Sequence, residues 1–337
     1  MWCRSCCRET QSDVCEICGD ATVAEIPSEV YWCPHCKIPL IKFKNSADKN
    51  ECPLCHQEVN YLCADVRPVF PQERLLVEIM LGKPLAFLKS SVWAAENRYY
   101  IDGKPITVSF GTYRKKSPAE LHNLLEKYAP QNDNLFFERH IQRFIEANMP
   151  RLNYIKDEAF EFIKSTAKSY PNECIVLSFS GGKDSTVTAD LAVRALSDPS
   201  LVHIFGNTTL EFPLTINYIQ RFRKNNPKAI LKIAINKEQN FYDVCKDIGP
   251  PARMLRWCCS MFKTGPITRV LNSLYPNRNI LTFYGIRKCE SVSRSKYNRV
   301  EDNAESVKIQ KQKVASPIFF WKDIDIWLYI LSQEIDF

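Results

Sequence analysis

From residue 173 onward, short apolar runs alternate with segments of helical periodicity, and this alternation constrains the fold more than any other feature of the chain. The apolar runs read CIVLSF, LVHIFGN, AILKIAI and NILTFYGI, and the helical patterns between them include TVTADLAVRAL and PLTINYIQRFRK. Short buried strands that alternate with helices build a mostly parallel sheet. We therefore predict an α/β domain over residues 171–337, with helices on both faces of the sheet and ligands at the carboxyl ends of the strands.

The first apolar run ends in a glycine-rich turn, FSGGKDST. A Walker loop needs a glycine five positions before Gly182 and a Ser or Thr directly after Lys183. Leu177 and Asp184 stand at those positions, so the turn is not a Walker loop. Its glycines still let backbone N–H groups converge on an anion at a helix N-terminus. We predict a phosphate site built from Ser180, Gly181, Gly182, Lys183, Asp184 and Ser185.

Four further segments carry motifs that occur, in this order, in one known family. They read NTTLEFPLT, RWCCSMFKTGP, GIRKCESVSR and PIFFWKDIDIW, and they begin at Asn207, Arg256, Gly285 and Pro317. Together with SGGKDS, they resemble the motifs of the phosphoadenosine phosphosulfate (PAPS) reductase family, within the PP-loop N-type ATP pyrophosphatases. The resemblance covers residues 172–337.

The resemblance implies a fold like that of the adenine nucleotide alpha-hydrolases, with ATP or PAPS as the bound nucleotide. It implies catalytic roles for Lys183, Asp184, Arg256, Cys258 and Cys259. Beyond the PP-loop, it implies nucleotide contacts from Asn207, Lys263, Gly285, Arg287 and Arg294. Arg and Lys side chains at strand ends suit phosphate and sulfate oxygens.

The adjacent cysteines Cys258 and Cys259 cannot close an ordinary disulfide, so they are core thiols, redox thiols or cluster ligands. In the iron–sulfur branch of the resembled family, such a pair with a later C-x-x-C is similar to the ligand set of a 4Fe–4S cluster. Here only Cys289 follows, and the E-C-G-L-H motif that carries the nucleophilic cysteine of PAPS reductases is absent. We expect a C-terminal tail beyond Phe337, and both a 4Fe–4S cluster on Cys258 and Cys259 and simple packing stay open.

Residues 1–66 form a separate cysteine-rich segment. Ten of the fifteen cysteines lie between Cys3 and Cys63, and eight of them form four C-x-x-C pairs. Two such pairs that converge on one ion give a tetrahedral four-cysteine zinc site. We predict two structural Zn²⁺ sites with the ligands Cys3, Cys6, Cys15, Cys18, Cys33, Cys36, Cys52 and Cys55. Consecutive pairs sharing an ion is the simplest arrangement, and crossed pairing stays open.

The charge of the cysteine-rich segment differs from that of the rest of the chain. Residues 1–63 contain six Lys and Arg against nine acids, although the whole chain carries a formal net charge of +7. This acidity disfavours direct phosphate-backbone contact and favours docking of a protein. Because the chain has no signal peptide and no apolar run near the roughly 18 residues that span a bilayer, we expect a cytoplasmic protein without membrane contact.

Residues 67–170 form a connecting region. Helical spacing in FPQERLLVEIMLG predicts a helix that ends at Gly82, and Asp102-Gly103 predicts a hairpin turn between two β-rich runs. Ser117, followed by proline and then Glu120, predicts a capped helix start. Two more helical patterns follow, NLFFERHIQRFIEANM and NYIKDEAFEFIKSTAKSY.

Several functions fit these motifs. The first is ATP-pyrophosphatase and sulfurtransferase chemistry, such as that of the DNA phosphorothioation enzymes in the resembled family. Reduction of a sulfonucleotide such as PAPS is an alternative, although Asn207 and Thr209 depart from the family's Asp and Gly. Further alternatives are a tRNA thiolase and a nucleotide-sensing scaffold. The expected partners are an adenine nucleotide and a sulfur-donor protein such as a cysteine desulfurase or a redoxin, with DNA or RNA contact left open.

Overall fold

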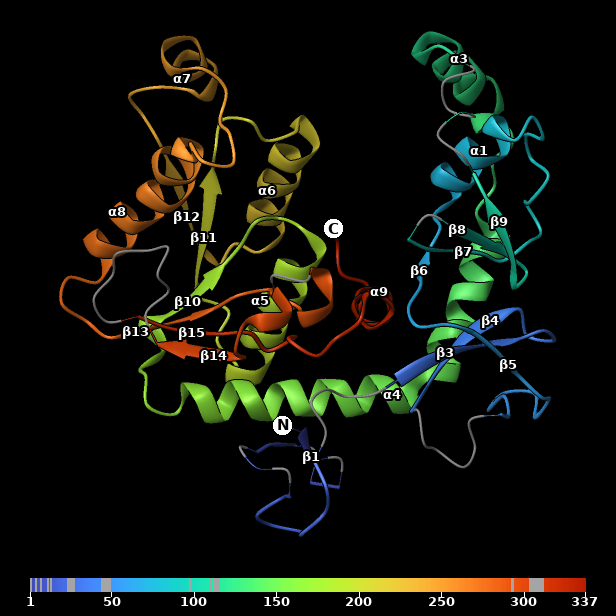
Figure 1. Ribbon diagram of the computed structural model, residues 1–337, viewed down its shortest axis with the longest axis horizontal. Coiled ribbons are helices and arrows are strands. Elements are labelled where there is room, and N and C mark those ends of the chain that lie inside the picture. The colour runs from blue at the N-terminus through green and yellow to red at the C-terminus, as the bar shows by residue number, and fades with distance from the viewer. Residues whose placement is uncertain are drawn as a thin grey trace. The chain divides into compact units, whose positions relative to one another are not determined.

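The computed structural model divides the chain into two compact units (Figure 1). Unit 1 comprises Met1–Tyr154 and Lys322–Glu334, and unit 2 comprises Ile155–Trp321 and Ile335–Phe337. The structure describes residues 2–3, 5–6, 8–10, 12, 14–22, 28–43, 50–96, 98–108, 111, 116–291, 294–302 and 312–337. Every predicted nucleotide motif begins in unit 2.

Unit 2 is built on a six-stranded sheet, which confirms the predicted α/β class. The strands are β10 (Ile175–Ser178), β11 (Val202–Asn207), β12 (Ile230–Ile235), β13 (Ile280–Phe283), β14 (Val300–Asp302) and β15 (Gln312–Ala315). Their order is β12-β11-β10-β13-β15-β14, and every neighbouring pair is parallel except β14 with β15. The sheet is therefore mostly parallel, as the alternation of runs and helices predicts.

Helices cover both faces of this sheet. They are α5 (Lys183–Leu196), α6 (Pro213–Asn225), α7 (Phe241–Ile248) and α8 (Gly265–Leu274). On one face, Val176 and Ile204 of the sheet pack with Leu271 of α8. On the other face, the ring of Phe222 in α6 lies 5.3 Å from the ring of His203. Because successive strand residues point to opposite faces, adjacent His203 and Ile204 contact different helices.

The order of the strands places β10 at a switch in chain direction. From β10 the chain builds outward through β11 to β12, and it then returns to the other side of β10 as β13. Open α/β sheets bind ligands at such a switch, outside the carboxyl ends of the strands. The glycine-rich turn follows β10 and the segment from Gly285 follows β13, so both predicted loops lie at this point.

The described residues of unit 1 form three small antiparallel sheets and four helices. The strands are β1 (Trp2–Cys3), β2 (Arg8–Glu9), β3 (Ser28–Cys33), β4 (Ile38–Phe43), β5 (Asn60–Cys63), β6 (Arg67–Pro68), β7 (Val92–Ala95), β8 (Arg98–Ile101) and β9 (Lys104–Thr107). The helices are α1 (Pro71–Met80), α3 (Pro118–Tyr128), the first part of α4 (Leu135–Ala167) and α9 (Asp323–Ser332). The predicted helix from residue 70, the Asp102-Gly103 hairpin and the Ser117–Glu120 capping box are all confirmed.

The two helical patterns predicted after residue 133 are one helix in the structure. α4 runs through Pro150, where a proline removes one backbone hydrogen bond without ending the helix. Since α4 crosses from unit 1 into unit 2 at residue 154, the boundaries expected after residues 66 and 170 do not separate the two units.

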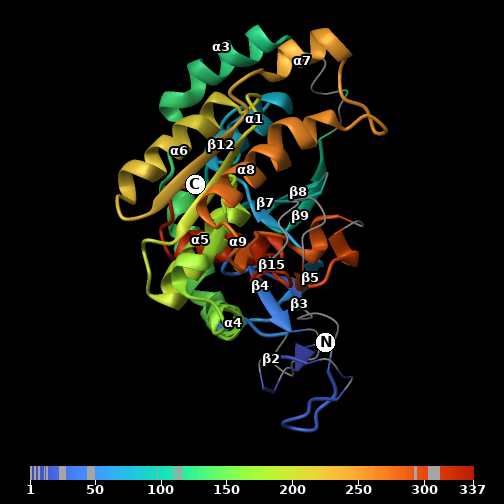
Figure 2. The same cartoon turned by 90° about the vertical axis from the view of Figure 1, so that its left-hand side faces the viewer.

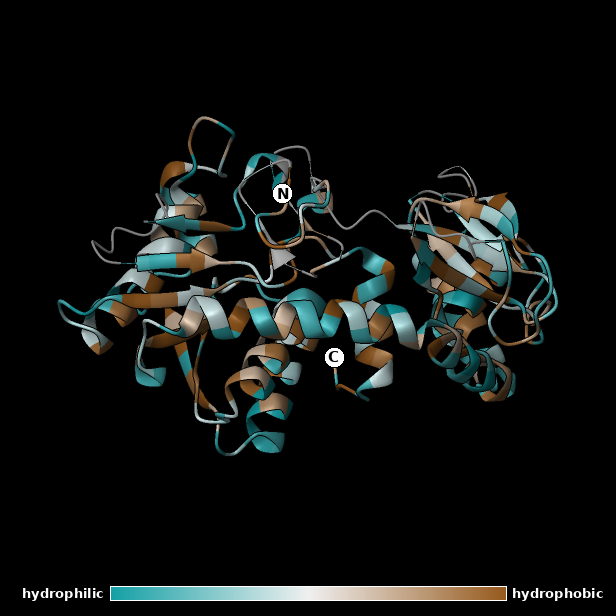
Figure 3. Cartoon of the chain, turned by 90° about the horizontal axis from the view of Figure 1, so that it is seen from below, coloured by the Kyte–Doolittle hydropathy of each residue, from teal (hydrophilic) through white to brown (hydrophobic). Residues whose placement is uncertain are grey.

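Hydrophilic and hydrophobic patches alternate along α4, the long helix in Figure 3. No helix in the described part of the chain is long and apolar enough to cross a bilayer.

The helix α9 begins within the last nucleotide motif but packs within unit 1. The Asp65 carboxylate accepts the backbone N–H groups of Asp323 at 2.8 Å and Ile324 at 3.1 Å, which caps the N-terminus of α9. One turn into the helix, Asp325 accepts both Nε and Nη2 of Arg151 at 2.9 and 2.8 Å. Both side chains of this ion pair are at most 2% exposed. The pair therefore fixes α9 to α4.

We predict that Asp325→Ala lowers the free energy of unfolding by about 3–5 kcal/mol, because it leaves the Arg151 guanidinium buried without its carboxylate. Urea denaturation followed by tryptophan fluorescence measures this loss. Arg194→Ala, which removes an exposed i,i+4 pair with Asp190, is the control and costs only about 0.5 kcal/mol. Equal losses in the two variants would show that the buried pair does not hold α9.

Candidate functional site

The glycine-rich turn presents the open N-terminus of a helix. Gly181 takes φ +75, which lets the chain turn sharply after β10, and α5 begins at Lys183 without a side-chain cap. The hydroxyls of Ser180 and Ser185 lie 3.0 Å apart, and the Ser185 hydroxyl donates to the Gly182 carbonyl at 2.9 Å. The serines thus hold the turn closed, while the first N–H groups of α5 and the helix dipole favour an anion.

One carboxylate holds two cations at this turn. Asp184 accepts Lys183 Nζ at 3.1 Å through one oxygen and Arg287 Nε at 2.7 Å through the other. Arg287 is only 5% exposed, so its charge is held among protein groups at a fixed position. Glu290 accepts the backbone N–H of Arg287 at 3.1 Å and pairs with Arg294. The structure therefore brings the predicted residues of the turn together with those of the loop after β13.

The close approach of these two loops depends on Gly285. A Cβ atom at this position would lie 2.7 Å from the backbone carbon and oxygen of Asp184 and 2.7 Å from the backbone nitrogen of Ser185. These are backbone atoms of the first turn of α5, which cannot move aside as a flexible side chain can. Only glycine lets the loop after β13 lie against the glycine-rich turn.

The segment after β11 departs from the resembled motif at Asn207 and Thr209, and the structure shows how both residues fit. Thr209 takes φ +65, a left-handed conformation that is rare for a β-branched residue and that glycine adopts freely. Asn207 accepts the backbone N–H of Thr209 at 2.9 Å, and the Thr209 hydroxyl accepts the N–H of Phe241 at 2.9 Å. The turn keeps the shape of a glycine turn and is tied to the start of α7.

The segment that carries Arg256 and Lys263 is anchored by its aromatic residues. Trp257 and Phe262 are buried with Val244 of α7, and a π-helix runs over Cys259–Thr264 directly before α8. Arg256 and Lys263 are exposed, and among the described residues neither side chain forms a hydrogen bond or an ion pair. Two cations without carboxylate partners on an anchored segment are suited to bind the oxygens of an anionic ligand. Short π-helical turns occur frequently at functional sites.

The thiols of this segment are not arranged like a preformed metal site. Cys258 packs against the Val244, Trp257 and Phe262 cluster, as does Cys245. Burial, together with the hydrogen bond to Cys259, raises the pKa of the Cys258 thiol. Within the described residues, Cys258 and Cys259 join no group of three or more ligand side chains. The 4Fe–4S cluster thus stays a prediction.

The predicted residues lie on two sides of β10. Arg287 and Arg294 follow β13, whereas Asn207 ends β11 and the π-helix with Lys263 contacts β11 and β12. The role of Glu290 in holding two arginines was missed from the sequence, although the residue stands within the GIRKCES motif. Also missed was Cys289, whose sulfur accepts Arg287 Nη1 at 3.4 Å.

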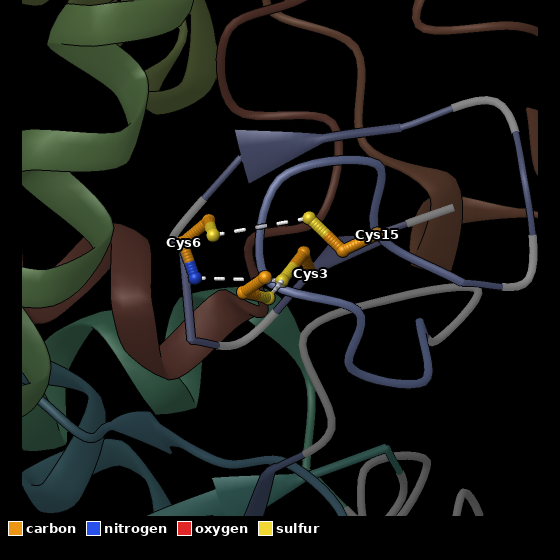
Figure 4. A group of neighbouring side chains, drawn as sticks. Cys3, Cys6 and Cys15 are labelled. Atoms are coloured by element: carbon orange, nitrogen blue, oxygen red, sulfur yellow. Dashed lines mark hydrogen bonds between the residues drawn. The ribbon is translucent and has the colours of Figure 1, made fainter.

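The two predicted cysteine groups are both present. In the first, the sulfur of Cys3 lies 3.4 Å from that of Cys18, and the sulfur of Cys6 lies 3.8 Å from that of Cys15 (Figure 4). In the second group, made of Cys33, Cys36, Cys52 and Cys55, the corresponding distances are 3.5 and 3.9 Å. Four sulfurs at about 2.3 Å from one tetrahedral ion lie about 3.8 Å apart. Both groups therefore fit a metal ion, and consecutive pairs form each group.

Electrostatics within the cysteine groups also favours a cation. The backbone N–H groups of Cys18 and Ile17 lower the pKa of Cys15 to about 6, whereas hydrogen bonding with Cys18 contributes most to raising the pKa of Cys6 to about 12. Neighbouring thiols thus compete for one negative charge, and a divalent ion would let all four ionise. In the second group, Arg143 Nη2 donates to Cys36 at 3.2 Å and links the group to α4.

Comparison with known proteins supports the family resemblance predicted for unit 2. The family model of the phosphoadenosine phosphosulfate reductase domain matches residues 174–337. Two uncharacterized proteins of Methanocaldococcus jannaschii are 33% and 32% identical to this chain over 62% and 60% of its length. The matches cover 42% and 46% of those relatives, so the chain spans less than half the length of either.

Characterised proteins are more distant. Sulfate adenylyltransferase subunit 2 of Brucella anthropi is 24% identical over 56% of this chain and 65% of its own length. The crystal structure of PAPS reductase from Candida auris, a phosphate complex, superimposes with a TM-score of 0.40 at 13% identity, over 55% of this chain and 87% of that one. The family match covers the sheet of unit 2 and every loop of the candidate site described above. Residues 174–337 are therefore similar to the phosphoadenosine phosphosulfate reductase domain, and the match includes the glycine-rich turn at Ser180–Ser185.

Proposed function

We propose that unit 2 binds ATP and splits it between the α- and β-phosphates to drive sulfur transfer. The observation that carries this proposal is the N-terminus of α5, which has no side-chain cap and begins at Lys183. The carboxylate of Asp184 holds Lys183 and Arg287 beside it. Several backbone N–H groups and a lysine in one turn can bind an anion as highly charged as pyrophosphate. The glycine-rich turn holds the departing pyrophosphate.

The chemistry follows from which bond breaks. An oxygen of the acceptor attacks the α-phosphorus of ATP, the bond to the β-phosphate breaks, and pyrophosphate leaves. The acceptor then carries AMP, which is a better leaving group than hydroxide or oxide. A persulfide sulfur from a donor protein, such as a cysteine desulfurase, displaces AMP and joins the acceptor to the donor through an S–S bond. A second thiol, of the donor or of a redoxin, attacks the donor's inner sulfur, which breaks that bond and leaves the outer sulfur on the acceptor. Sulfur transfer to DNA, as in phosphorothioation, is one reaction of this type. Arg256, Lys263 and Arg287 stabilise the charge that develops on the phosphoryl oxygens.

Reduction of a sulfonucleotide is the second candidate. It is favoured by Cys258 and Cys259, two thiols on the same anchored segment as Arg256 and Lys263. In that case a thiol, with a redoxin as electron donor, releases sulfite from PAPS instead of pyrophosphate from ATP. The two candidates are separated by the product, pyrophosphate or sulfite, that the full chain forms from each nucleotide.

We predict that Lys183→Ala weakens ATP binding at least tenfold and abolishes pyrophosphate release, because the turn loses the charge of its lysine. Arg256→Ala is expected to abolish release as well. Calorimetric titration with ATP and an enzymatic pyrophosphate assay measure the two effects. Lys168→Ala, which removes an exposed lysine directly after α4, is the control. Wild-type affinity in both site variants would remove these residues from the site, and tight ATP binding without pyrophosphate from any acceptor would favour a nucleotide sensor.

We also predict that Gly285→Ala impairs ATP binding at least tenfold, because its methyl group would meet the backbone of Asp184 at 2.7 Å. Gly206→Ala is the matched control. There the methyl group would meet only the flexible end of Ile267, at 3.1 Å. Titration with ATP compares the two variants, and equal affinities would show that the loop after β13 need not lie against the turn.

For the cysteine groups we propose structural zinc in both. Four thiolates fill a tetrahedral zinc ion and leave no position for substrate, so the metal stabilises the fold and takes no part in catalysis. Chelation is expected to unfold residues 1–66 and leave unit 2 folded, since a segment of this size lacks a sufficient core. Limited proteolysis with and without chelator tests this. If residues 1–66 stayed resistant after two zinc ions per chain were removed, the structural role would be wrong.

A further inference from the structure

We propose that the open edge of the unit 2 sheet binds single-stranded nucleic acid. The binding surface consists of a basic edge, defined as Arg223, Lys224, Lys228, Lys232, Lys237 and Arg269, and of an apolar rim beside it, defined as Phe212, Leu214, Tyr242 and Met254. Neither set belongs to the nucleotide site. The inference rests in part on the proposed function, because it identifies the macromolecule that the sulfur chemistry would modify.

The charge of this part of the chain is far from balanced. Residues 213–283 contain twelve Lys and Arg against three acids, a surplus of nine, whereas the whole chain has a surplus of seven. No acid occurs between Asp247 and Glu290. The net positive charge of the whole chain therefore comes from the segment that contains the edge strand and the helices beside it. Such a surplus attracts polyanions.

The six cations of the basic edge surround one strand. β12 is the outermost strand of the sheet, and Figure 2 looks onto it between α6 and α8. Lys232 lies on β12, Lys237 follows its end, and Lys228 lies in the turn that enters it. The other cations lie in the last turn of α6 and on α8. A strand of this length extends for about 20 Å, so the cations border a path of several nucleotides.

The cations of the basic edge are available for a ligand. All six are exposed, and among the residues that the structure describes, none of their side chains forms a hydrogen bond or an ion pair. Elsewhere in unit 2, Arg194, Arg221 and Arg278 each pair with a carboxylate. A cluster without any carboxylate partner therefore contrasts with the ordinary surface of the same unit.

Large exposed apolar side chains lie in the segments that follow β11 and β12. Phe212 is 78% exposed, Leu214 80%, Tyr242 65% and Met254 95%. The hydrogen bond from Phe241 N–H to Thr209 joins the loop of Phe212 to the helix of Tyr242. Exposed aromatic faces stack with unpaired bases, and neighbouring cations bind the phosphates between those bases. The rim thus adds a reason for single strands, whose bases are free, over duplexes.

The composition of the basic edge favours nucleic acid over an acidic protein. Four of its six cations are lysines. Lysine is depleted in protein–protein interfaces, whereas lysine and arginine together supply phosphate contacts in nucleic-acid complexes. An apolar rim alone would suit a protein, but a rim beside six cations whose side chains pair with no carboxylate among the described residues matches a single-strand channel.

The test measures binding without ATP. Fluorescence anisotropy of labelled 20-nucleotide oligo-dT and oligo-rU is titrated with the full chain between 50 and 200 mM salt. Six phosphate contacts give a log–log salt slope of about −4, at about −0.7 per contact. Lys228→Ala with Lys232→Ala should weaken binding about tenfold and reduce the slope by about 1.4. The matched control, Lys164→Ala in the last turn of α4 with Lys168→Ala directly after it, should change neither.

A second pair of variants tests the rim. Phe212→Ala with Tyr242→Ala should weaken single-strand binding about tenfold without changing the salt slope. The inference is overturned if no binding occurs at 50 mM salt, or if the α4 control weakens binding as much as the edge variant. It is also overturned if a duplex of equal length, or a poly-glutamate chain of equal charge, competes as well as the single strand. Because ATP is absent, failure here leaves the proposed nucleotide chemistry to its own test.

Discussion

The carboxylate of Asp184 holds the candidate site together. It lies in the first turn of α5, next to Lys183, and it accepts the nearly buried guanidinium of Arg287 from the loop after β13. A buried arginine without a carboxylate is costly, so this contact fixes the second loop against the first. The contact is possible only because residue 285 lacks a Cβ. One ion pair and one glycine thereby join the loops of two neighbouring parallel strands at the switch point of the sheet.

The pairing of charges divides the cations of unit 2 into groups with different uses. Lys183 and Arg287 share one carboxylate, so their positions are fixed while their combined charge stays positive. Arg256 and Lys263 lie exposed on an anchored segment and are available to a phosphate or sulfate group. An electrostatically prepared site of this kind stabilises charge that develops during phosphoryl transfer without first reorganising. Exposed cations without carboxylate partners among the described residues likewise support the inference for the open edge of the sheet.

Local patterns predicted a large part of this fold, and tertiary contacts decided the rest. Four of the six strands of unit 2 (β10, β11, β12 and β13), the glycine-rich turn and both cysteine groups follow from short-range spacing, and the structure contains them all. The strands β14 and β15 were not predicted. The sequence did not predict that two helical patterns join in α4 or that α9 packs in unit 1. The packing of α9 depends on Asp65 and Arg151, which are distant from it in sequence. The left-handed Thr209 was visible only as a departure from a motif, and its tie to Phe241 needs the folded chain.

The position at which ATP is cleaved tests the account most directly. The full chain is incubated with ATP labelled at the α-phosphate, a sulfur donor and a single-stranded polynucleotide, and the labelled products are separated by chromatography. Cleavage between the α- and β-phosphates predicts that the label is found in AMP, with one pyrophosphate released for each AMP. Label in ADP, with release of inorganic phosphate, would show that the turn transfers the γ-phosphate and would contradict the account.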